Sequence, residues 1–233
     1  MTENKKPIAI IPARGGSKRI LKKNTKFFSG KPIIEYSIEA ALKCDLFQKV
    51  IISTDSDEIA SIAEKAGAEI PFMRPPELSD DLTTTAPVLV HAVKEMNKKG
   101  VDFPYFCCIY ATAPFILPKY LIEGFELLKE KNLGSVFPIT SYPFPIFRAH
   151  KIQEDGTLVM FWPEHMNTRS NTLPQAYHDA GQFYWYNTEK FLKEPVLYSK
   201  DAQGIVLPRF MVQDIDTPED WETAEKLFQV LNN

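Results

Sequence analysis

A glycine-rich, strongly basic segment follows the first apolar run of the chain. Gly15 and Gly16 lie at its centre, and glycine adopts positive φ readily and lets the backbone approach an anion. Arg14, Lys18 and Lys23 add positive charge. These residue types predict a phosphate-binding loop, with a solvated basic turn as the alternative. The sequence has neither Gly-x4-Gly-Lys-Ser/Thr nor Gly-x-Gly-x-x-Gly, which excludes the P-loop and the dinucleotide-binding loop.

Two carboxylates, Asp214 and Asp216, form the second candidate site. We expect residues 211–216 to be the end of a strand, where side chains two positions apart share a face. Adjacent carboxylates repel each other unless a cation joins them, and Mg²⁺, which is usually shared with substrate phosphates, suits such a pair. The alternative is an acidic cap on the last helix. Together, the basic loop and the acidic pair would supply the parts for phosphoryl or nucleotidyl transfer.

The elements that must position these residues alternate along the chain. Short β-branched runs and amphipathic stretches predict βαβ units and a mostly parallel sheet. Polar loops follow the predicted strands, and open α/β sheets bind ligands at that carboxyl edge. We expect strands at 8–11, 50–53, 70–73, 105–110, 135–138 and 181–186, and helices at 33–42, 57–66, 87–98, 118–128 and 218–231.

The alternation stops at residues 140–175, where the sequence is rich in proline and aromatic residues. We expect an inserted β arm, because so many aromatic side chains would not stay in water. The arm would pack against a partner subunit or cover the site. A lid folded on its own subunit is the alternative.

Length and composition limit the class of protein. The 233 residues predict a single domain, 1–233, and a net charge of -3 is unlike that of a general nucleic-acid binder. A polar N-terminus and the lack of a run of about 18 apolar residues predict no signal peptide, no membrane segment and a cytoplasmic location. The three cysteines lack metal-site spacing, so we expect buried free thiols.

Four motifs in this order resemble the CMP-sugar synthetases that activate nonulosonic acids, the acylneuraminate cytidylyltransferase family. They are the basic loop at 8–24, Ser53-Thr54-Asp55, Arg74-Pro-Pro-Glu-Leu and Asp214-Ile-Asp-Thr. The resemblance covers nearly the whole chain. It implies a three-layer α/β/α, Rossmann-like nucleotide-binding fold of the nucleotide-diphospho-sugar transferase type, with CTP and an acid sugar as substrates, Mg²⁺ as cofactor and a homodimer as the assembly.

Two segments resemble most the branch of this family that activates pseudaminic acid for flagellin glycosylation and surface polysaccharide biosynthesis. Residues 174–185 replace an Arg-Pro-Asn-Gly type of sequence, and residues 110–114 replace Gln-Pro-Thr-Ser-Pro. Pseudaminic acid differs from neuraminic acid by a second N-acetyl group and a deoxygenated terminal carbon. N-acetylneuraminate and 3-deoxy-octulosonate stay open as acceptors.

The resemblance also implies roles for individual residues. Lys23, Arg14 and Asp216 would be catalytic, and Asp214 and Asp216 would hold the metal. The CTP site would comprise Ala13, Arg14, Gly15, Lys18, Lys23, Asn24 and Arg74, and the sugar site Tyr110, Thr112, Gln175, His178 and Gln182. For His178 the alternative is a packed loop histidine. Leu21 stands where the family commonly has proline, which would free φ in the loop without removing a donor.

Two other classes of function stay open. A metal-dependent glycosyltransferase also uses an Asp-x-Asp pair, but that pair usually follows a strand in the middle of the chain, whereas here it lies near the end. A non-catalytic nucleotide-binding module would bind CTP without releasing pyrophosphate, and it would leave Lys23 and the acidic pair unexplained.

Overall fold

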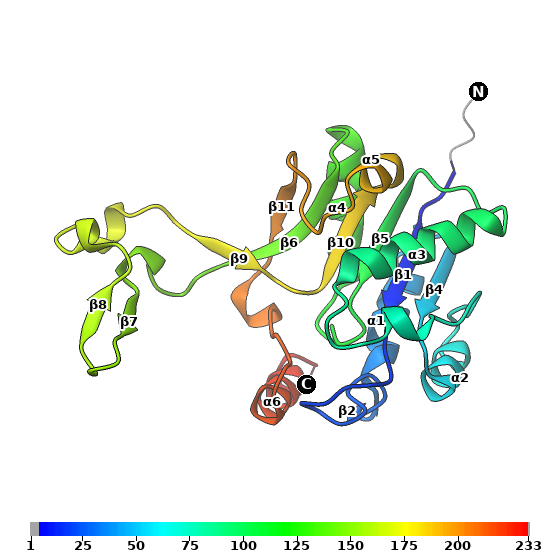
Figure 1. Ribbon diagram of the computed structural model, residues 1–233, viewed down its shortest axis with the longest axis horizontal. Coiled ribbons are helices and arrows are strands. Elements are labelled where there is room, and N and C mark those ends of the chain that lie inside the picture. The colour runs from blue at the N-terminus through cyan, green and yellow to red at the C-terminus, as the bar shows by residue number, and fades with distance from the viewer. Residues whose placement is uncertain (1–4, 233) are drawn as a thin grey trace.

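The computed structural model describes residues 5–232 and has three layers, with an arm that projects from them (Figure 1). The strands of the seven-stranded middle layer are β1 (Ile8–Pro12), β4 (Lys49–Ser53), β5 (Tyr105–Ile109), β6 (Ser135–Ser141), β9 (Tyr177–Asp179), β10 (Phe183–Asn187) and β11 (Gln203–Val206). Their order is β11-β6-β10-β5-β1-β4, with β9 paired to β6. Apart from β9 and β10, these strands run in one direction. The mainly parallel sheet is therefore confirmed.

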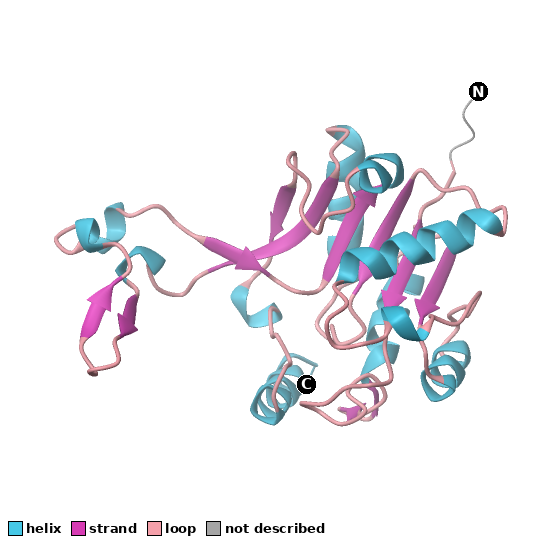
Figure 2. Ribbon diagram, in the orientation of Figure 1, coloured by secondary structure: helices cyan, strands magenta, loops and turns pink. Residues whose placement is uncertain are grey.

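Helices cover both faces of the sheet (Figure 2). On one face lie α1 (Ile33–Lys43), α2 (Asp57–Lys65) and α4 (Pro118–Glu130), and on the other lie α3 (Thr85–Lys98) and α5 (Thr188–Lys193). Strand β1 shows why two cores form, because successive side chains point to opposite faces. Ala9 and Ile11 belong to the first core, whereas Ile8 and Ile10 belong to the second.

The last helix, α6 (Pro218–Asn232), closes a third apolar cluster beside the basic loop. Its Trp221 packs edge-on against Phe28, with ring centroids 5.5 Å apart. Phe28 belongs to a small hairpin of β2 (Phe27–Phe28) and β3 (Lys31–Pro32). Helix α6 is thus packed against the β2–β3 hairpin. Short 3₁₀ turns η1 (Pro76–Leu78), η2 (Ile146–Arg148), η3 (Pro163–His165), η4 (Ser170–Thr172) and η5 (Arg209–Met211) join the larger elements.

Side-chain caps begin helices α2 and α6. The Ser56 side chain accepts from the Ile59 N–H at the start of α2, and Gly67 follows its end with φ +97°. At the start of α6, the Thr217 hydroxyl accepts from the Asp220 N–H at 3.2 Å, and the Asp220 carboxylate accepts from the Thr217 N–H at 2.7 Å. This reciprocal capping fixes the chain directly after Asp216.

Several predicted elements differ from the observed ones. Residues 70–73 form no strand, because pairing there is limited to isolated bridges at Glu69 and Met73. Residues 212–216 are a loop after η5, so the predicted strand under the acidic pair was wrong. The last strand is β11, which lies earlier in the chain and which, with α5, the sequence analysis missed. Helix α3 begins at Thr85, two residues before the predicted start at Pro87.

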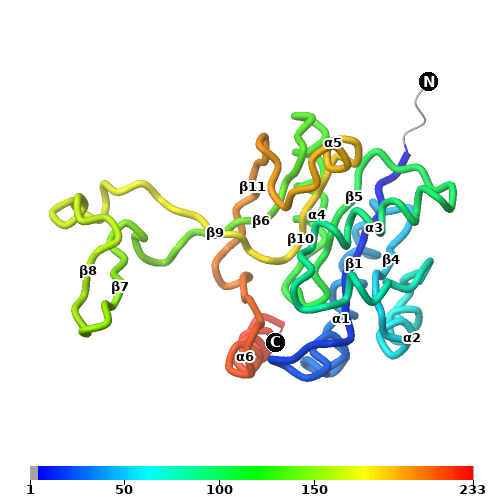
Figure 3. The backbone as a smooth tube through the Cα atoms, viewed as in Figure 1, coloured from blue at the N-terminus to red at the C-terminus, as the bar shows by residue number. Residues whose placement is uncertain are grey.

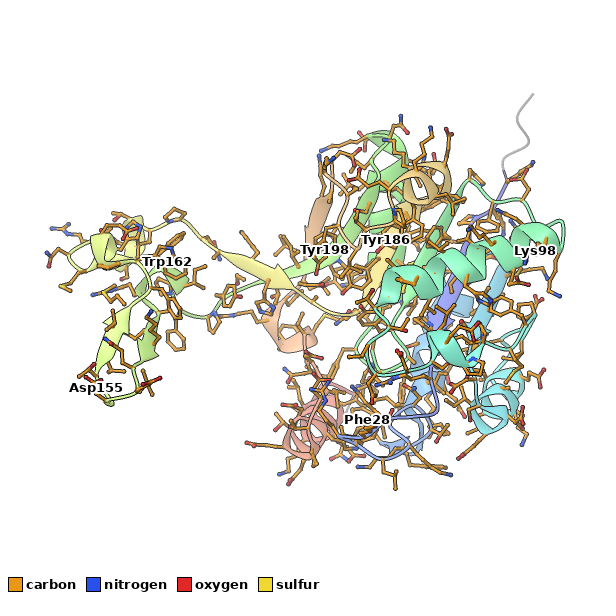
Figure 4. The ribbon with its side chains drawn as sticks, in the orientation of Figure 1. Phe28, Lys98, Asp155, Trp162, Tyr186 and Tyr198 are labelled. Atoms are coloured by element: carbon orange, nitrogen blue, oxygen red, sulfur yellow. The ribbon has the colours of Figure 1, made fainter. Side chains whose placement is uncertain are left out.

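The predicted arm at 140–175 leaves the body between β6 and β9 and projects away from it (Figures 1 and 3). Its first two residues still belong to β6. The arm carries an antiparallel hairpin of β7 (His150–Ile152) and β8 (Leu158–Met160), and Asp155 lies at the hairpin tip (Figure 4). Because it stands apart from the body, the arm is not folded over the site of its own chain.

Two further expectations concern the helices and the thiols. No helix among residues 5–232 is long and apolar enough to cross a membrane. Cys44, Cys107 and Cys108 are buried and free, as predicted. Burial raises the pKa of the Cys107 thiol well above its ordinary value, which keeps it protonated and unreactive.

Candidate functional site

A basic cavity of about 250 Å³ opens at the carboxyl edge of the sheet. Its walls are the loops that follow β1 and β5, the start of α3 and the segment before α6. Parallel strands bring these loops together because their carboxyl ends meet at one edge. The residues that line it include Arg14, Lys18, Arg19, Lys23, Asn24, Arg74, Thr83, Thr84, Thr85, Tyr110, Thr112 and Asp216.

Backbone groups of the loop after β1 are held by hydrogen bonds. Ala13 donates its N–H to the Ser53 carbonyl at 3.0 Å, and the Asn24 amide donates to the Arg14 carbonyl at 2.9 Å. The predicted positive φ at Gly15 and Gly16 was wrong, since neither has one. A Cβ at Gly15 would lie 3.1 Å from Ser56 Cβ, so close packing explains that glycine. The Gly15 N–H donates to the Asp55 carboxylate at 2.8 Å instead of pointing to an anion site.

Two loop cations share one carboxylate from the loop before α3. Arg14 Nη1 lies 2.6 Å from Asp81 Oδ1 and 2.8 Å from the Asp80 carbonyl oxygen, and Lys18 pairs with the other Asp81 oxygen. The hydrogen bonds from Lys18 and then Arg14 hold the pKa of Asp81 below its ordinary value. Asp81 therefore lies between two cations, in a place that would also suit a phosphate group.

Two further cations of the loop contact Asp216. Arg19 Nη1 lies 2.8 Å from Asp216 Oδ2, and Lys23 Nζ lies 3.3 Å from Oδ1 of the same residue. Asp214 is exposed, yet partial desolvation in its cavity, followed by the charge of Asp216, raises its pKa. The two carboxylates are thus close enough to repel each other.

Arg74 is a buried cation beneath the basic cavity. Its guanidinium donates to Ser53 Oγ at 3.1 Å and also to the Ser53 carbonyl. Burial lowers its pKa to about 10, so the side chain keeps its charge at neutral pH. Arg74 therefore fixes the end of β4 and adds positive potential below the cavity.

A second cavity, of about 300 Å³, shares Tyr110 with the first. We call it the acidic cavity, because Asp179 and Asp214 both line it, beside His178 and Tyr184. Asp216 lines the basic cavity and Asp214 lines the acidic one. The acidic pair thus stands where the two cavities adjoin.

Comparison with known proteins identifies the family. A family model described as Cytidylyltransferase matches residues 8–230. The chain belongs to the cytidylyltransferase family. It is therefore a nucleotidyltransferase, and the predicted resemblance is confirmed.

Curated relatives of this cytidylyltransferase act on acid sugars, according to their names. The chain is 40% identical to the pseudaminic acid cytidylyltransferase of Campylobacter jejuni over 225 residues, which are 97% of each chain. It is 30% identical to the CMP-N,N'-diacetyllegionaminic acid synthase of Legionella pneumophila over 96% of each chain. It is also 36% identical to a Helicobacter pylori protein named as pseudaminic acid cytidylyltransferase and a hydrolase, covering 89% of this chain and 40% of that one.

Solved structures share the fold of the cytidylyltransferase. CMP:2-keto-3-deoxy-manno-octonic acid synthetase, solved in complex with CTP, superposes with a TM-score of 0.70 at 17% identity, covering 97% of this chain and 99% of that one. The 4-diphosphocytidyl-2C-methyl-D-erythritol synthase of Anaerococcus prevotii has a TM-score of 0.64 at 15% identity, covering 97% and 100%. These likenesses confirm the predicted nucleotidyltransferase-type fold.

The structure brings most of the predicted nucleotide residues together. Arg14, Lys18, Lys23, Asn24 and Arg74 line the basic cavity. The predicted contacts Ala13 and Gly15 are not among its lining residues, because their N–H groups bond to Ser53 and Asp55.

The predicted sugar residues are divided among several places. Tyr110 and His178 line the acidic cavity, whereas Thr112 lines the basic one. Gln182 is buried and donates to the Met211 carbonyl at 2.6 Å, so its amide nitrogen links the turn before β10 to η5. Gln175 is exposed in the loop before β9 and lines neither cavity.

Sequence reasoning missed several residues of this site. Three successive threonines line the cavity at the start of α3: Thr83, Thr84 and Thr85. This run of hydroxyl groups after an acidic loop is visible in the sequence and could have indicated a binding site. Arg19 lies in the basic loop at 8–24, but no role was predicted for it. The pairing of Asp81 with Arg14 depends on a contact 67 positions apart along the chain, which no local pattern reveals.

The donor set at the cavity boundary fits a hard divalent cation. Asp214 and Asp216 offer carboxylate oxygens, which Mg²⁺ prefers, and basic groups for phosphates lie beside them. Within residues 5–232, no cluster of three or more His, Cys, Asp or Glu side chains could hold a metal ion. Two carboxylates suit an ion that keeps waters and shares its coordination with substrate phosphates.

Proposed function

We propose that this cytidylyltransferase transfers CMP from CTP to the anomeric hydroxyl of pseudaminic acid and releases pyrophosphate. The observation that carries the proposal is the pair of adjoining cavities that share Tyr110, one basic and one acidic. The basic cavity has the cations for a triphosphate, and the acidic cavity has room for a second substrate. The 40% identity to the Campylobacter jejuni enzyme, over 97% of each chain, supports pseudaminic acid as the acceptor.

In this proposal, the basic loop holds the triphosphate in line with the acceptor. The acceptor hydroxyl gives its proton to solvent and its oxygen forms a bond to the α-phosphorus, while the bond to the bridging oxygen of the β-phosphate breaks. Negative charge then builds up on the leaving pyrophosphate, and Arg14, Lys18 and Lys23 are placed to stabilise it. Because CTP must displace Asp81 from Arg14 and Lys18, its phosphates exchange one anionic partner for another.

We also propose Mg²⁺ as the cofactor, held by Asp214 and Asp216. When bound, the ion would neutralise phosphate charge and lower the pKa of a coordinated hydroxyl group. The side chains of the chain itself prepare this place. Arg19 and Lys23 balance the charge of Asp216 in the ligand-free protein, and the capped start of α6 fixes its backbone.

The products distinguish this reaction from that of a glycosyltransferase. With CTP, Mg²⁺ and pseudaminic acid, phosphorus NMR should show pyrophosphate and one new phosphodiester per turnover. A glycosyltransferase would instead consume a finished CMP-sugar and release CMP. Formation of CMP from such a sugar, without any synthesis from CTP, would reject the proposal.

We propose a homodimer in which the arm packs on a second copy. Phe144, Ile152 and Leu158 have 79%, 75% and 67% of their surface exposed, and the arm stands away from its own body. Burying such side chains favours association by the hydrophobic effect. Analytical ultracentrifugation should show a dimer for the wild-type chain and a monomer for Phe144→Glu combined with Leu158→Glu. The tip variant Glu154→Gln is the control, and a wild-type monomer would refute the dimer.

The proposed substrates also place the enzyme in a pathway. CTP is made in the cytoplasm, so we propose that the enzyme acts there and supplies a sugar for flagellin glycosylation or a surface polysaccharide. Deleting the gene in its host should remove CMP-pseudaminic acid from cell extracts. An unchanged level of this CMP-sugar would contradict the assignment.

A further inference from the structure

Asp179 binds two tyrosines at the wall of the acidic cavity. Its Oδ2 accepts from the Tyr184 hydroxyl at 2.7 Å and from the Tyr198 hydroxyl at 2.6 Å. Its Oδ1 accepts from the Gly181 N–H at 2.8 Å, in a turn where Gly181 has φ +63°. Tyr198 lies on the side of the sheet from which the arm departs (Figure 4). All three bonds come from the protein itself, so this carboxylate is held rigidly.

This arrangement fixes the direction of the hydroxyl protons. A tyrosine hydroxyl has one proton and can also accept, whereas a carboxylate can only accept. Tyr184 and Tyr198 must therefore both direct their protons at Asp179. The oxygen of Tyr184, which lines the cavity, is left with only the ability to accept. Burial raises the pKa of Tyr184, so the hydroxyl keeps its proton.

His178 also offers a hydrogen-bond acceptor. Its Nδ1 lies 2.8 Å from the Asp179 carbonyl oxygen, and a carbonyl only accepts, so Nδ1 carries the proton. In the neutral ring, Nε2 is then an acceptor. The Asp214 carboxylate, which also lines the acidic cavity, can likewise only accept. Tyr110 lines the cavity too, and its hydroxyl can donate or accept. At Tyr184, His178 and Asp214, a ligand must therefore bring donors.

We propose that Asp179 is a positioning residue that makes Tyr184 a hydrogen-bond acceptor for an amide N–H of the acceptor sugar. The inference rests on the proposed function. A sugar hydroxyl could adapt to either polarity by rotating its proton, but an acetamido N–H can only donate. A fixed acceptor at Tyr184 therefore suits an acetamido N–H, and pseudaminic acid has two acetamido groups.

The test uses the acceptor and two analogues, in each of which one acetamido N–H is replaced by an ester oxygen. For the wild-type enzyme, kcat/KM should fall about tenfold for one of these analogues, since its ester oxygen and the Tyr184 oxygen are both acceptors. In Asp179→Asn, one amide oxygen cannot serve all three donors. When the amide oxygen keeps its hydrogen bond from the Gly181 N–H, the NH₂ group donates to the two tyrosine oxygens. The tyrosine protons are then no longer directed at residue 179. The preference for the amide over the ester should then fall to about one, while KM for CTP stays unchanged.

Two further variants keep the test decisive. Tyr184→Phe retains the ring and removes the acceptor, so it should also abolish the preference. Tyr198→Phe leaves the bond between Asp179 and Tyr184 intact and should keep the preference. An unchanged preference in folded Asp179→Asn, or in Tyr184→Phe if Asp179→Asn does not fold, overturns the inference. Equal rates of the wild-type enzyme with amide and ester would do the same. Absence of turnover with any acceptor would instead reject the proposed function.

Discussion

Lys23 Nζ lies 3.3 Å from Oδ1 of Asp216, a residue 193 positions later in the chain. This pair joins the loop after β1 to the segment before α6. It therefore connects the basic loop with the acidic pair, which are far apart in the sequence. The Lys23 side chain is only 19% exposed, whereas that of Lys18 is 80% exposed. Of the loop lysines 18, 22 and 23, Lys23 is thus the least exposed.

Replacing Lys23 by alanine should mainly lower kcat. Its charge is most valuable when negative charge moves to the leaving group, so we expect a loss of about 100-fold in kcat and a smaller change in KM for CTP. Steady-state pyrophosphate release measures both. Lys22→Ala is the matched control, because Lys22 pairs with Glu58 and does not line the basic cavity. A large rise in KM with unchanged kcat would reject this role.

Asp216→Asn should abolish most Mg²⁺-dependent turnover and leave the fold intact. The variant removes one of two proposed metal ligands, while α6 keeps its reciprocal cap between Thr217 and Asp220. Titration of activity with Mg²⁺, alongside a circular dichroism melt, measures both properties. Glu219→Gln, an exposed change three residues away, is the control. Nearly normal activity of Asp216→Asn would mean that the residue serves only the helix start.

Asp81→Asn should strengthen the binding of CTP. In the ligand-free protein, Arg14 and Lys18 are paired with this carboxylate, and the phosphates of CTP must displace it. Calorimetry without an acceptor should show a Kd lower by about threefold, a modest gain because exposed ion pairs are weak. Glu77→Gln, in the same loop, should leave Kd unchanged. Weaker CTP binding by Asp81→Asn would show that the carboxylate supports the site rather than competing for it.

Asp214→Asn should raise the melting temperature of the metal-free protein at pH 7. The folded protein raises the pKa of Asp214, so its contribution to stability is fully present below the unfolded pKa of about 3.9 and is lost as the pH rises through the folded pKa. An asparagine side chain does not ionise, so the variant does not lose this stability as the pH rises. Its advantage should therefore disappear in melts below about pH 3.5. Glu154→Gln, in the exposed arm, controls for net charge, and an equal gain in both variants would contradict a local cause.

Local signals predicted the parts of the site that depend on neighbouring residues. The apolar run of β1 and the cations after it identified the basic cavity, and the helix predicted at 218–231 is confirmed as α6. The pairing of Asp81 with Arg14 and of Asp179 with Tyr198 arises from tertiary contacts, which spacing along the chain does not encode. Asp214 and Asp216 lie on a loop because η5 ends at Met211, and the strand that precedes them, β11, has only four residues. A run of four residues is too short to show a clear hydrophobic period, so β11 was not predicted.

The most direct test of the proposed function is pyrophosphate release from CTP and Mg²⁺ with three acids offered separately at equal concentration. These are pseudaminic acid, N-acetylneuraminic acid and 3-deoxy-octulosonate. We predict rapid release with pseudaminic acid and little with the other two. Release with another acid would keep the reaction but reject the acceptor. Folded protein that releases no pyrophosphate with any of them would contradict the proposed function itself.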